Sequence, residues 1–179
     1  GIDLLISGNI TQSQGTGSLS TAGPGTIQIS GNASYGGSTI VTQGNLVVSG
    51  SLSATASVGV ASGANLEVDG MTNSAASATV DGQLSGKGSV GPVNIDSGGT
   101  LAPGLSLGNT TPGVLTANGN VSLTDNSSIF SIRLGIVSGA NGGNDQLVVA
   151  NSGTVSLNGA TLQLTIGGFL TAADVNQYY

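Results

Sequence analysis

Five short apolar runs, each preceded by a glycine, decide the fold of this chain: Gly25-Thr-Ile-Gln-Ile29, Gly44-Asn-Leu-Val-Val48, Gly63-Ala-Asn-Leu-Glu-Val68, Gly82-Gln-Leu84 and Gly99-Thr-Leu101. The first four glycines are spaced by 19, 19 and 19 residues, and the fifth follows after 17. The aliphatic residues behind them are 19, 20, 18 and 17 residues apart: Ile27, Leu46, Leu66, Leu84 and Leu101. A period of about twenty residues is too short for a helical hairpin and is typical of one turn of a β-solenoid.

Apolar and polar residues alternate within these runs. Ile27 and Ile29 flank Gln28, and the same pattern continues through Leu66-Glu-Val68, Val93-Asn-Ile95, Val121-Ser-Leu123 and Leu162-Gln-Leu-Thr-Ile166. A period of two places the aliphatic side chains on one face of a strand, whereas no segment has the spacing of an amphipathic helix. We therefore expect an all-β, right-handed, single-stranded parallel β-helix with about 17–20 residues per rung. At about 4.8 Å per rung, eight or nine rungs would form a rod of roughly 40 Å.

Glycine-rich dipeptides separate the runs and mark the corners between strands. Gly31-Asn32, Gly36-Gly37 and Gly119-Asn120 are residue pairs that tolerate positive φ, which tight corners demand. The repeat loosens near residues 102–113 and 138–144, where we expect irregular loops that bulge from the rod. Since Val121 onward resembles what precedes it, residues 1–179 are expected to form one continuous solenoid segment, a fragment of a longer chain.

The composition excludes several classes of function. Lys87 and Arg133 are the two cations in a chain whose net charge is -6, which argues against nucleic acid and anionic membrane surfaces as partners. Hydrophobic residues nevertheless make up 37%, so a core can form. The sequence has no cysteine and no histidine, so it cannot build a disulfide, a thiol nucleophile or a His-based triad.

One segment resembles a known repeat. Residues 26–50 read as a strand, Ser30-Gly-Asn32, Tyr35, Gly36-Gly37, a β-branched strand, Gly44 and a second strand. This order resembles the passenger-associated strand repeat of bacterial autotransporters. Residues 98–119 look like the final passenger rungs, and residues 144–164 fit the same kind of region. The resemblance implies a β-helix exported through the outer membrane to the bacterial surface or beyond, with membrane contact only through a C-terminal translocator outside this sequence.

Scattered acids are the candidates for chemistry. Stacked along one face, Asp81, Asp96, Asp125 and Asp145 could serve as a carboxylate pair or a calcium site. Single acids without local clustering are more often strand-end or turn residues, and that is our expectation for all four. The segment Gly142-Gly-Asn-Asp145 resembles one unit of a calcium-binding nonapeptide, which requires tandem copies. We expect Asp145 to cap a turn instead.

The remaining candidates also have ordinary structural explanations. We expect Lys87 and Arg133 to be isolated and solvated, with Arg133 pointing outward from its strand. Tyr35 could stack on a carbohydrate, but a corner residue that packs across two rungs is the expected role. Five asparagines begin Asn-x-Ser/Thr triplets, which arise by chance in such a composition: Asn9, Asn32, Asn109, Asn120 and Asn126.

These observations favour a non-enzymatic, secreted or surface-exposed stalk or adhesin segment. We expect no catalytic, cofactor or metal-binding residues, and as partners a host or cell-surface protein or glycan, or a second copy of the chain. Residues 4–66 contain no charged residue, which leaves a self-assembling extracellular fibre as an alternative. A polysaccharide-degrading β-helix enzyme is the third hypothesis.

Overall fold

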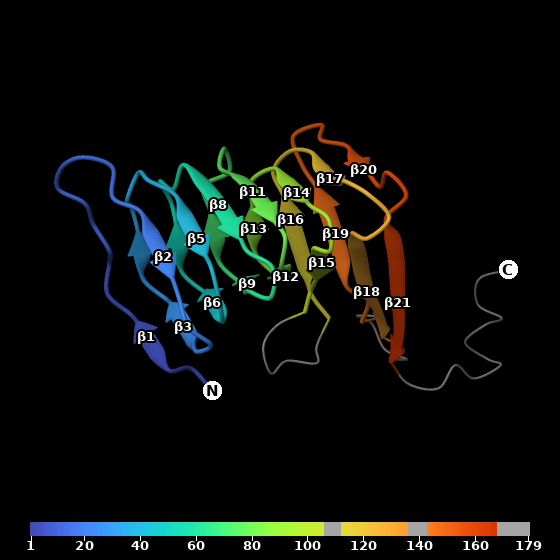
Figure 1. Cartoon of the computed structure of the whole chain (residues 1–179), viewed down its shortest axis with the longest axis horizontal. Coiled ribbons are helices and arrows are strands. Elements are labelled where there is room, and N and C mark those ends of the chain that lie inside the picture. The colour runs from blue at the N-terminus through green and yellow to red at the C-terminus, as the bar shows by residue number, and fades with distance from the viewer. Residues whose placement is uncertain (106–111, 136–142, 168–179) are drawn as a thin grey trace, which may run out of the picture.

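The chain forms an elongated stack of parallel strands, as the computed structural model in Figure 1 shows. The structure describes residues 1–105, 112–135 and 143–167. Within these ranges every regular element is a β-strand, and every pair of named strands is parallel. The predicted all-β, parallel β-solenoid is confirmed.

The strands form three sheets, which we call A, B and C. Sheet A contains β1 (Leu4–Ile6), β3 (Thr26–Ile29), β6 (Asn45–Val48), β9 (Asn65–Val68), β12 (Gln83–Gly86), β15 (Thr100–Pro103), β18 (Ile129–Gly135) and β21 (Thr161–Gly167). Sheet B contains β4 (Asn32–Ala33), β7 (Ser51–Leu52), β10 (Met71–Thr72), β13 (Ser89–Val90), β16 (Val114–Ala117) and β19 (Gln146–Val149). Sheet C contains β2 (Leu19–Thr21), β5 (Thr39–Val41), β8 (Ser57–Val60), β11 (Ser77–Val80), β14 (Val93–Ile95), β17 (Val121–Leu123) and β20 (Val155–Ser156). From β3 onward the chain passes through A, B and C in turn, so three consecutive strands make one rung.

The aliphatic column predicted from the sequence is the register of sheet A. Leu46 pairs with Ile27 on one side and Leu66 on the other, and Leu84 pairs with Leu66 and Leu101. The column then continues to Phe130 and Leu162. Because Leu46, Leu66, Leu84 and Leu101 are fully buried, each rung covers the apolar side chain of the next.

The same stacking fills the tube from the other two sheets. In sheet B, Leu52 lies between Ala33 and Thr72 of the neighbouring rungs. In sheet C, Val60 lies between Val41 and Val80. Side chains from all three sheets meet in one hydrophobic core, which runs along the rod. A single rung could not bury its own apolar face, so stability comes from contacts between neighbours.

Glycines form a column at the corner between sheets A and B. A Cβ on Gly50 would overlap the carbonyl oxygen of Gly31, one on Gly70 that of Gly50, and one on Gly88 that of Gly70. Neither Gly31 nor Gly37 has a positive φ, so the expected reason for these two glycines was wrong. Their corners require glycine because successive rungs approach too closely for a side chain.

Positive φ occurs at other corners, as expected at Gly119 before β17 with φ of 138°, and at several corners that lead into sheet A. Gly44 and Gly63 precede β6 and β9 with φ of 69° and 78°. Glycine occupies this left-handed region at little cost, whereas other residues are strained there. Positive φ alone requires glycine at Gly63, whereas at Gly44 a Cβ would also overlap the carbonyl oxygens of Gly23 and Gly25.

The two expected loops both fall at the A–B corner, on successive rungs. The first begins later than predicted, because Ala102 and Pro103 belong to β15, and the chain departs only at Gly104. Most of the second predicted loop, residues 138–142, lies outside the described residues. Asn144, at its end, makes an antiparallel bridge to Leu134. After Val121, strands β17 to β21 join the same three sheets.

Truncating one core side chain should test the stacking directly. Leu66→Ala removes a fully buried side chain that is packed between two rungs, and it should lower the free energy of unfolding by about 2–5 kcal/mol in urea denaturation. Leu5→Ala is the matched control, because Leu5 is 56% exposed, and it should change stability by less than about 0.5 kcal/mol. Equal losses for the two variants would contradict the stacked-core assignment.

Candidate functional site

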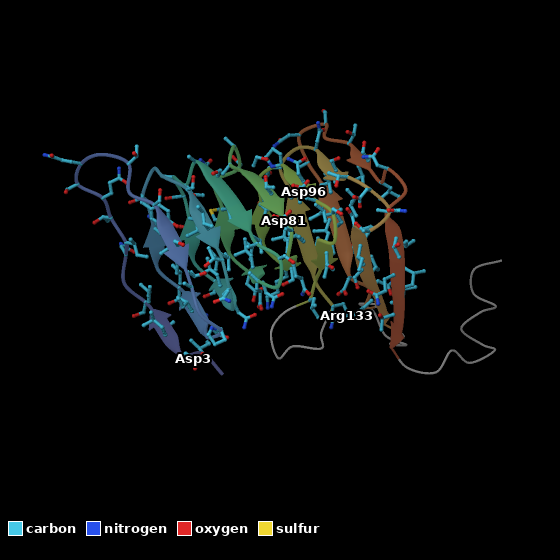
Figure 2. All side chains as sticks on the ribbon, in the orientation of Figure 1. Asp3, Asp81, Asp96 and Arg133 are labelled. Atoms are coloured by element: carbon cyan, nitrogen blue, oxygen red, sulfur yellow. The ribbon has the colours of Figure 1, made fainter. Side chains whose placement is uncertain are left out.

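Four charged residues gather at the A–B corner in the middle and later rungs, and we call them the corner cluster: Asp69, Lys87, Arg133 and Asp145. Asp69 and Lys87 follow β9 and β12, where the corner is only two residues long. Arg133 lies in β18, and Asp145 directly precedes β19. Figure 2 shows Arg133 on the lower edge of the rod, away from Asp81 and Asp96. Both cations of the chain therefore lie in one corner.

Arg133 and Asp145 form a two-pronged ion pair. The Nε of Arg133 donates to Oδ2 of Asp145 at 2.8 Å, and its NH2 group donates to Oδ1 at 3.1 Å. The side chain of Asp145 is 1% exposed and that of Arg133 is 23% exposed. Such forked guanidinium–carboxylate pairs are among the strongest polar contacts in proteins.

Backbone groups complete the environment of the Asp145 carboxylate. The backbone N–H of Arg133 donates to Oδ2 at 3.1 Å, and that of Gly113 donates to Oδ1 at 3.3 Å. The NH2 group of Arg133 also donates to the carbonyl oxygen of Gly104 at 2.9 Å. A charge taken out of water is tolerated only when its hydrogen-bonding capacity is satisfied, and here four donors surround one carboxylate.

Gly104 makes room for this carboxylate. It has a φ of 76°, and a Cβ at that position would overlap Oδ1 of Asp145. The pair therefore connects four parts of the corner. Arg133 belongs to β18 and Asp145 precedes β19, while Gly104 follows β15 and Gly113 precedes β16. Both loops at this corner are anchored at one point.

Asp69 and Lys87 form a weaker pair in the same corner. Their charged atoms are 3.7 Å apart, and their side chains are 18% and 47% exposed. The backbone N–H of Lys87 also donates to Oδ1 of Asp69, at 3.3 Å. An exposed pair of this kind contributes at most about 1 kcal/mol.

The sequence-based expectations for the corner cluster were wrong in three respects. Lys87 and Arg133 are paired rather than isolated, Arg133 is largely buried, and Asp145 holds an ion pair instead of capping a solvated turn. The alternation within β18 does place Arg133 on the outer side, opposite Phe130 and Ile132. The segment before β19 then folds back over β18 and covers Arg133, and nothing in local periodicity encodes that return.

The other three candidate acids, Asp81, Asp96 and Asp125, are strand-end or turn residues, as expected. Asp81 and Asp96 follow the paired residues Val80 and Ile95, so they lie on adjacent rungs, above Arg133 in Figure 2. Asp81 is exposed and Asp96 half-buried. Asp125 accepts hydrogen bonds from the Ser127 hydroxyl at 2.7 Å and from the Ser127 N–H at 2.9 Å, and these bonds lower the pKa of its carboxyl.

Tyr35 packs in the core at the corner between sheets B and C. It is 4% exposed, so its ring cannot serve as the carbohydrate platform considered above, and the corner role is confirmed. Its hydroxyl bonds the Thr39 hydroxyl at 2.7 Å, which in turn bonds that of Thr55 on the next rung at 2.9 Å. Burial raises the pKa of the Tyr35 phenol.

Four of the five asparagines of the Asn-x-Ser/Thr triplets are described by the structure, and they lie at strand ends and corners. Oδ1 of Asn9 accepts a hydrogen bond from the N–H of Asn32 at 3.1 Å, and Oδ1 of Asn120 accepts one from the N–H of Thr154 at 3.0 Å. These bonds connect neighbouring rungs. Asn126 is exposed, and Asn109 lies outside the described residues.

The charged atoms of the corner cluster contact one another or backbone groups. The cluster therefore has a structural role. Within residues 1–105, 112–135 and 143–167, no three or more acidic side chains are placed to hold a metal ion together. The same ranges contain no helix long and apolar enough to cross a membrane.

The two ion pairs should differ sharply in their contribution to stability. Asp145→Ala leaves the guanidinium of Arg133 without its buried carboxylate, and it should cost about 3–5 kcal/mol of unfolding free energy in urea. The matched variant Asp69→Ala breaks the exposed pair and should cost less than about 1 kcal/mol. Comparable losses would show that burial does not distinguish the pairs.

Comparison with protein-family models, with curated protein sequences and with solved structures found no match to this chain.

Proposed function

We propose that the chain is a non-enzymatic stalk or adhesin segment on the outside of a cell, built in the manner of an autotransporter passenger. In this role a stiff rod holds a binding module away from the surface or presents its own long faces to a host or cell-surface protein or glycan. The observation that carries the proposal is the unbroken ladder of sheet A, in which eight strands pair in sequence from β1 to β21.

Stiffness follows from how this ladder is built. Every rung is hydrogen-bonded to the rungs beside it, and the aliphatic column of sheet A stacks from Ile27 to Leu101 without interruption. Bending such a rod breaks several contacts at once, whereas a flexible linker of equal length bends without breaking any contact.

The outer faces support the same role. Polar side chains bond from rung to rung along the rod, as in Asn65 to Asn45 at 2.8 Å on sheet A and Ser38 to Ser57 at 2.9 Å on sheet C. Asn118 bonds Ser89 at 2.7 Å beside sheet B. These contacts place rows of hydroxyl and amide groups on the surface of the rod, which suit contact with uncharged polar partners.

A capture assay under flow tests the stalk role. The chain is displayed on cells through an inert anchor, with a single-domain antibody at its free end, and is compared with a Gly-Ser linker of equal residue number. Antigen-coated beads should be captured better by the rod as shear rises, because a stiff spacer keeps the antibody extended.

Two comparisons make the assay decisive. Leu66→Asp places a carboxylate in the buried column and should reduce capture to the level of the linker. Equal capture by the rod and the linker would refute the stalk role. In a second assay, cells that display the chain alone are tested for attachment to host cells, matrix proteins and glycan surfaces. No attachment in this assay would refute the adhesin role.

A self-assembling extracellular fibre is the second candidate, favoured by the exposed aliphatic residues at the two edges of sheet A. Leu4 in β1 is 50% exposed, and Leu162 and Leu164 in β21 are 55% and 53% exposed. The two edges have parallel strands of the same polarity, so one copy could continue the ladder of another head to tail.

Light scattering over a concentration series tests the fibre candidate. The apparent mass should rise with concentration, and Leu162→Lys should abolish the rise by placing a charge on the stacking surface. Thr161→Lys, on the neighbouring exposed position of the same strand, should have a smaller effect. A mass that stays monomeric at all concentrations excludes the fibre and leaves the stalk untouched.

A further inference from the structure

The first rung is built differently from the rungs that follow it. β1 and β2 have three residues each, and residues 7–18, which connect them, contain no strand of sheet B. In place of that strand, Ile10 makes a single parallel bridge to Ala33. Figure 1 shows the connection as a loop at the blue end of the rod, between β1 and β2.

Side chains of the first rung accept backbone N–H groups of the second rung. The Asp3 carboxylate accepts the N–H of Thr26 at 2.8 Å, and Oδ1 of Asn9 accepts the N–H of Asn32 at 3.1 Å. Both donors precede or begin a strand, β3 in one case and β4 in the other. A side chain that accepts such an N–H does what a capping side chain does at the N-terminus of a helix.

The next rung along the rod satisfies the equivalent N–H groups with backbone carbonyls. Asn45 pairs with Thr26, and its N–H donates to the Gly25 carbonyl at 2.9 Å. Ser51 pairs with Asn32, and its N–H donates to a glycine carbonyl at 3.1 Å. The side chains of the first rung therefore replace carbonyl oxygens that a regular rung would supply.

Gln12 ties the middle of the connection to the second rung. Its Oε1 accepts the N–H of Gly36 at 3.0 Å and that of Gly17 at 2.8 Å, and its Nε2 donates to the carbonyl of Gly15. One side chain thus folds the turn over residues 12–17 and fastens it to the corner between sheets B and C.

Apolar burial holds the first rung less firmly than the rungs inside the rod. Leu4 and Leu5 are 50% and 56% exposed, and Ile10 and Leu19 are only partly buried, whereas Leu46 is fully buried. Parts of a protein with few buried apolar contacts open locally at low free energy. Polar contacts therefore carry a larger share of the attachment here than elsewhere in the described rod.

We propose that Asp3, Asn9 and Gln12 form a latch, which holds the first rung closed on the second. When the latch opens, residues 1–21 separate from the second rung together, and the edges of β3, β4 and β5 become available for pairing with another strand. The inference concerns a conformational device and stands independently of the proposed function.

Amide hydrogen exchange, followed residue by residue by NMR, tests the latch. The amides of Ile10 and Leu19 are the reporters, because they donate to carbonyls of the second rung and no latch side chain takes part in these bonds. In the triple variant Asp3→Ala/Asn9→Ala/Gln12→Ala, both should exchange at least roughly tenfold faster, since the bonds that hold the rung closed are lost together.

Two controls separate opening of the first rung from a general loosening of the rod. Gln14 is exposed in the same connection, and Gln14→Ala should leave exchange at Ile10 and Leu19 unchanged. In the triple variant, the amides of Asn45 and Ser51 should keep their rates, because their acceptors are carbonyls that the substitutions do not touch. Unchanged exchange at Ile10 and Leu19, or an equal rise at Asn45 and Ser51, overturns the proposal.

A single substitution keeps the test decisive if the triple variant lacks a β-sheet circular dichroism signal. Gln12→Ala removes one member of the latch and is measured at the same two amides. Faster exchange of Ile10 and Leu19 supports the latch, and unchanged exchange overturns it.

Discussion

The structure depends on the spacing that backbone hydrogen bonds impose between successive rungs. Parallel strands in a sheet lie about 4.8 Å apart, so each side chain meets the residue at the same position of the rung above and below. Like residues must therefore stack on like residues. The column of Leu46, Leu66, Leu84 and Leu101 satisfies this requirement inside the tube, and asparagine, serine and threonine satisfy it outside.

The same spacing explains why glycine is so frequent. At the A–B corner the carbonyl oxygen of one rung occupies the place where a side chain of the next would begin, as at Gly50 and Gly70. Elsewhere, as at Gly44, the backbone turns through positive φ. Close approach of the backbone and positive φ recur at a similar interval, because both belong to the rung. The regular spacing of glycine in the sequence therefore has two physical origins.

The buried ion pair lies where the repeat is interrupted. Asp69 and Lys87 form an exposed pair at regular corners of two residues, whereas Arg133 and Asp145 lie where the connection between sheets A and B is longer. A buried ion pair seldom adds much stability compared with apolar packing, but it penalises every arrangement in which the partners are apart.

The sequence alone was sufficient to determine the solenoid, the residues of its inner column and the turn roles of Asp81, Asp96 and Asp125, because these follow from period and alternation within each rung. The corner role of Tyr35 also followed from its place in the repeat. The tertiary structure alone decided that Lys87 and Arg133 are paired, that Asp145 is buried, and that the Gly31 corner is tight rather than left-handed. The reason is physical: Arg133 and Asp145 meet because a loop returns across a strand, and the Gly31 corner is tight because another rung lies against it. Periodicity describes a rung, whereas these contacts are formed between rungs and between loops.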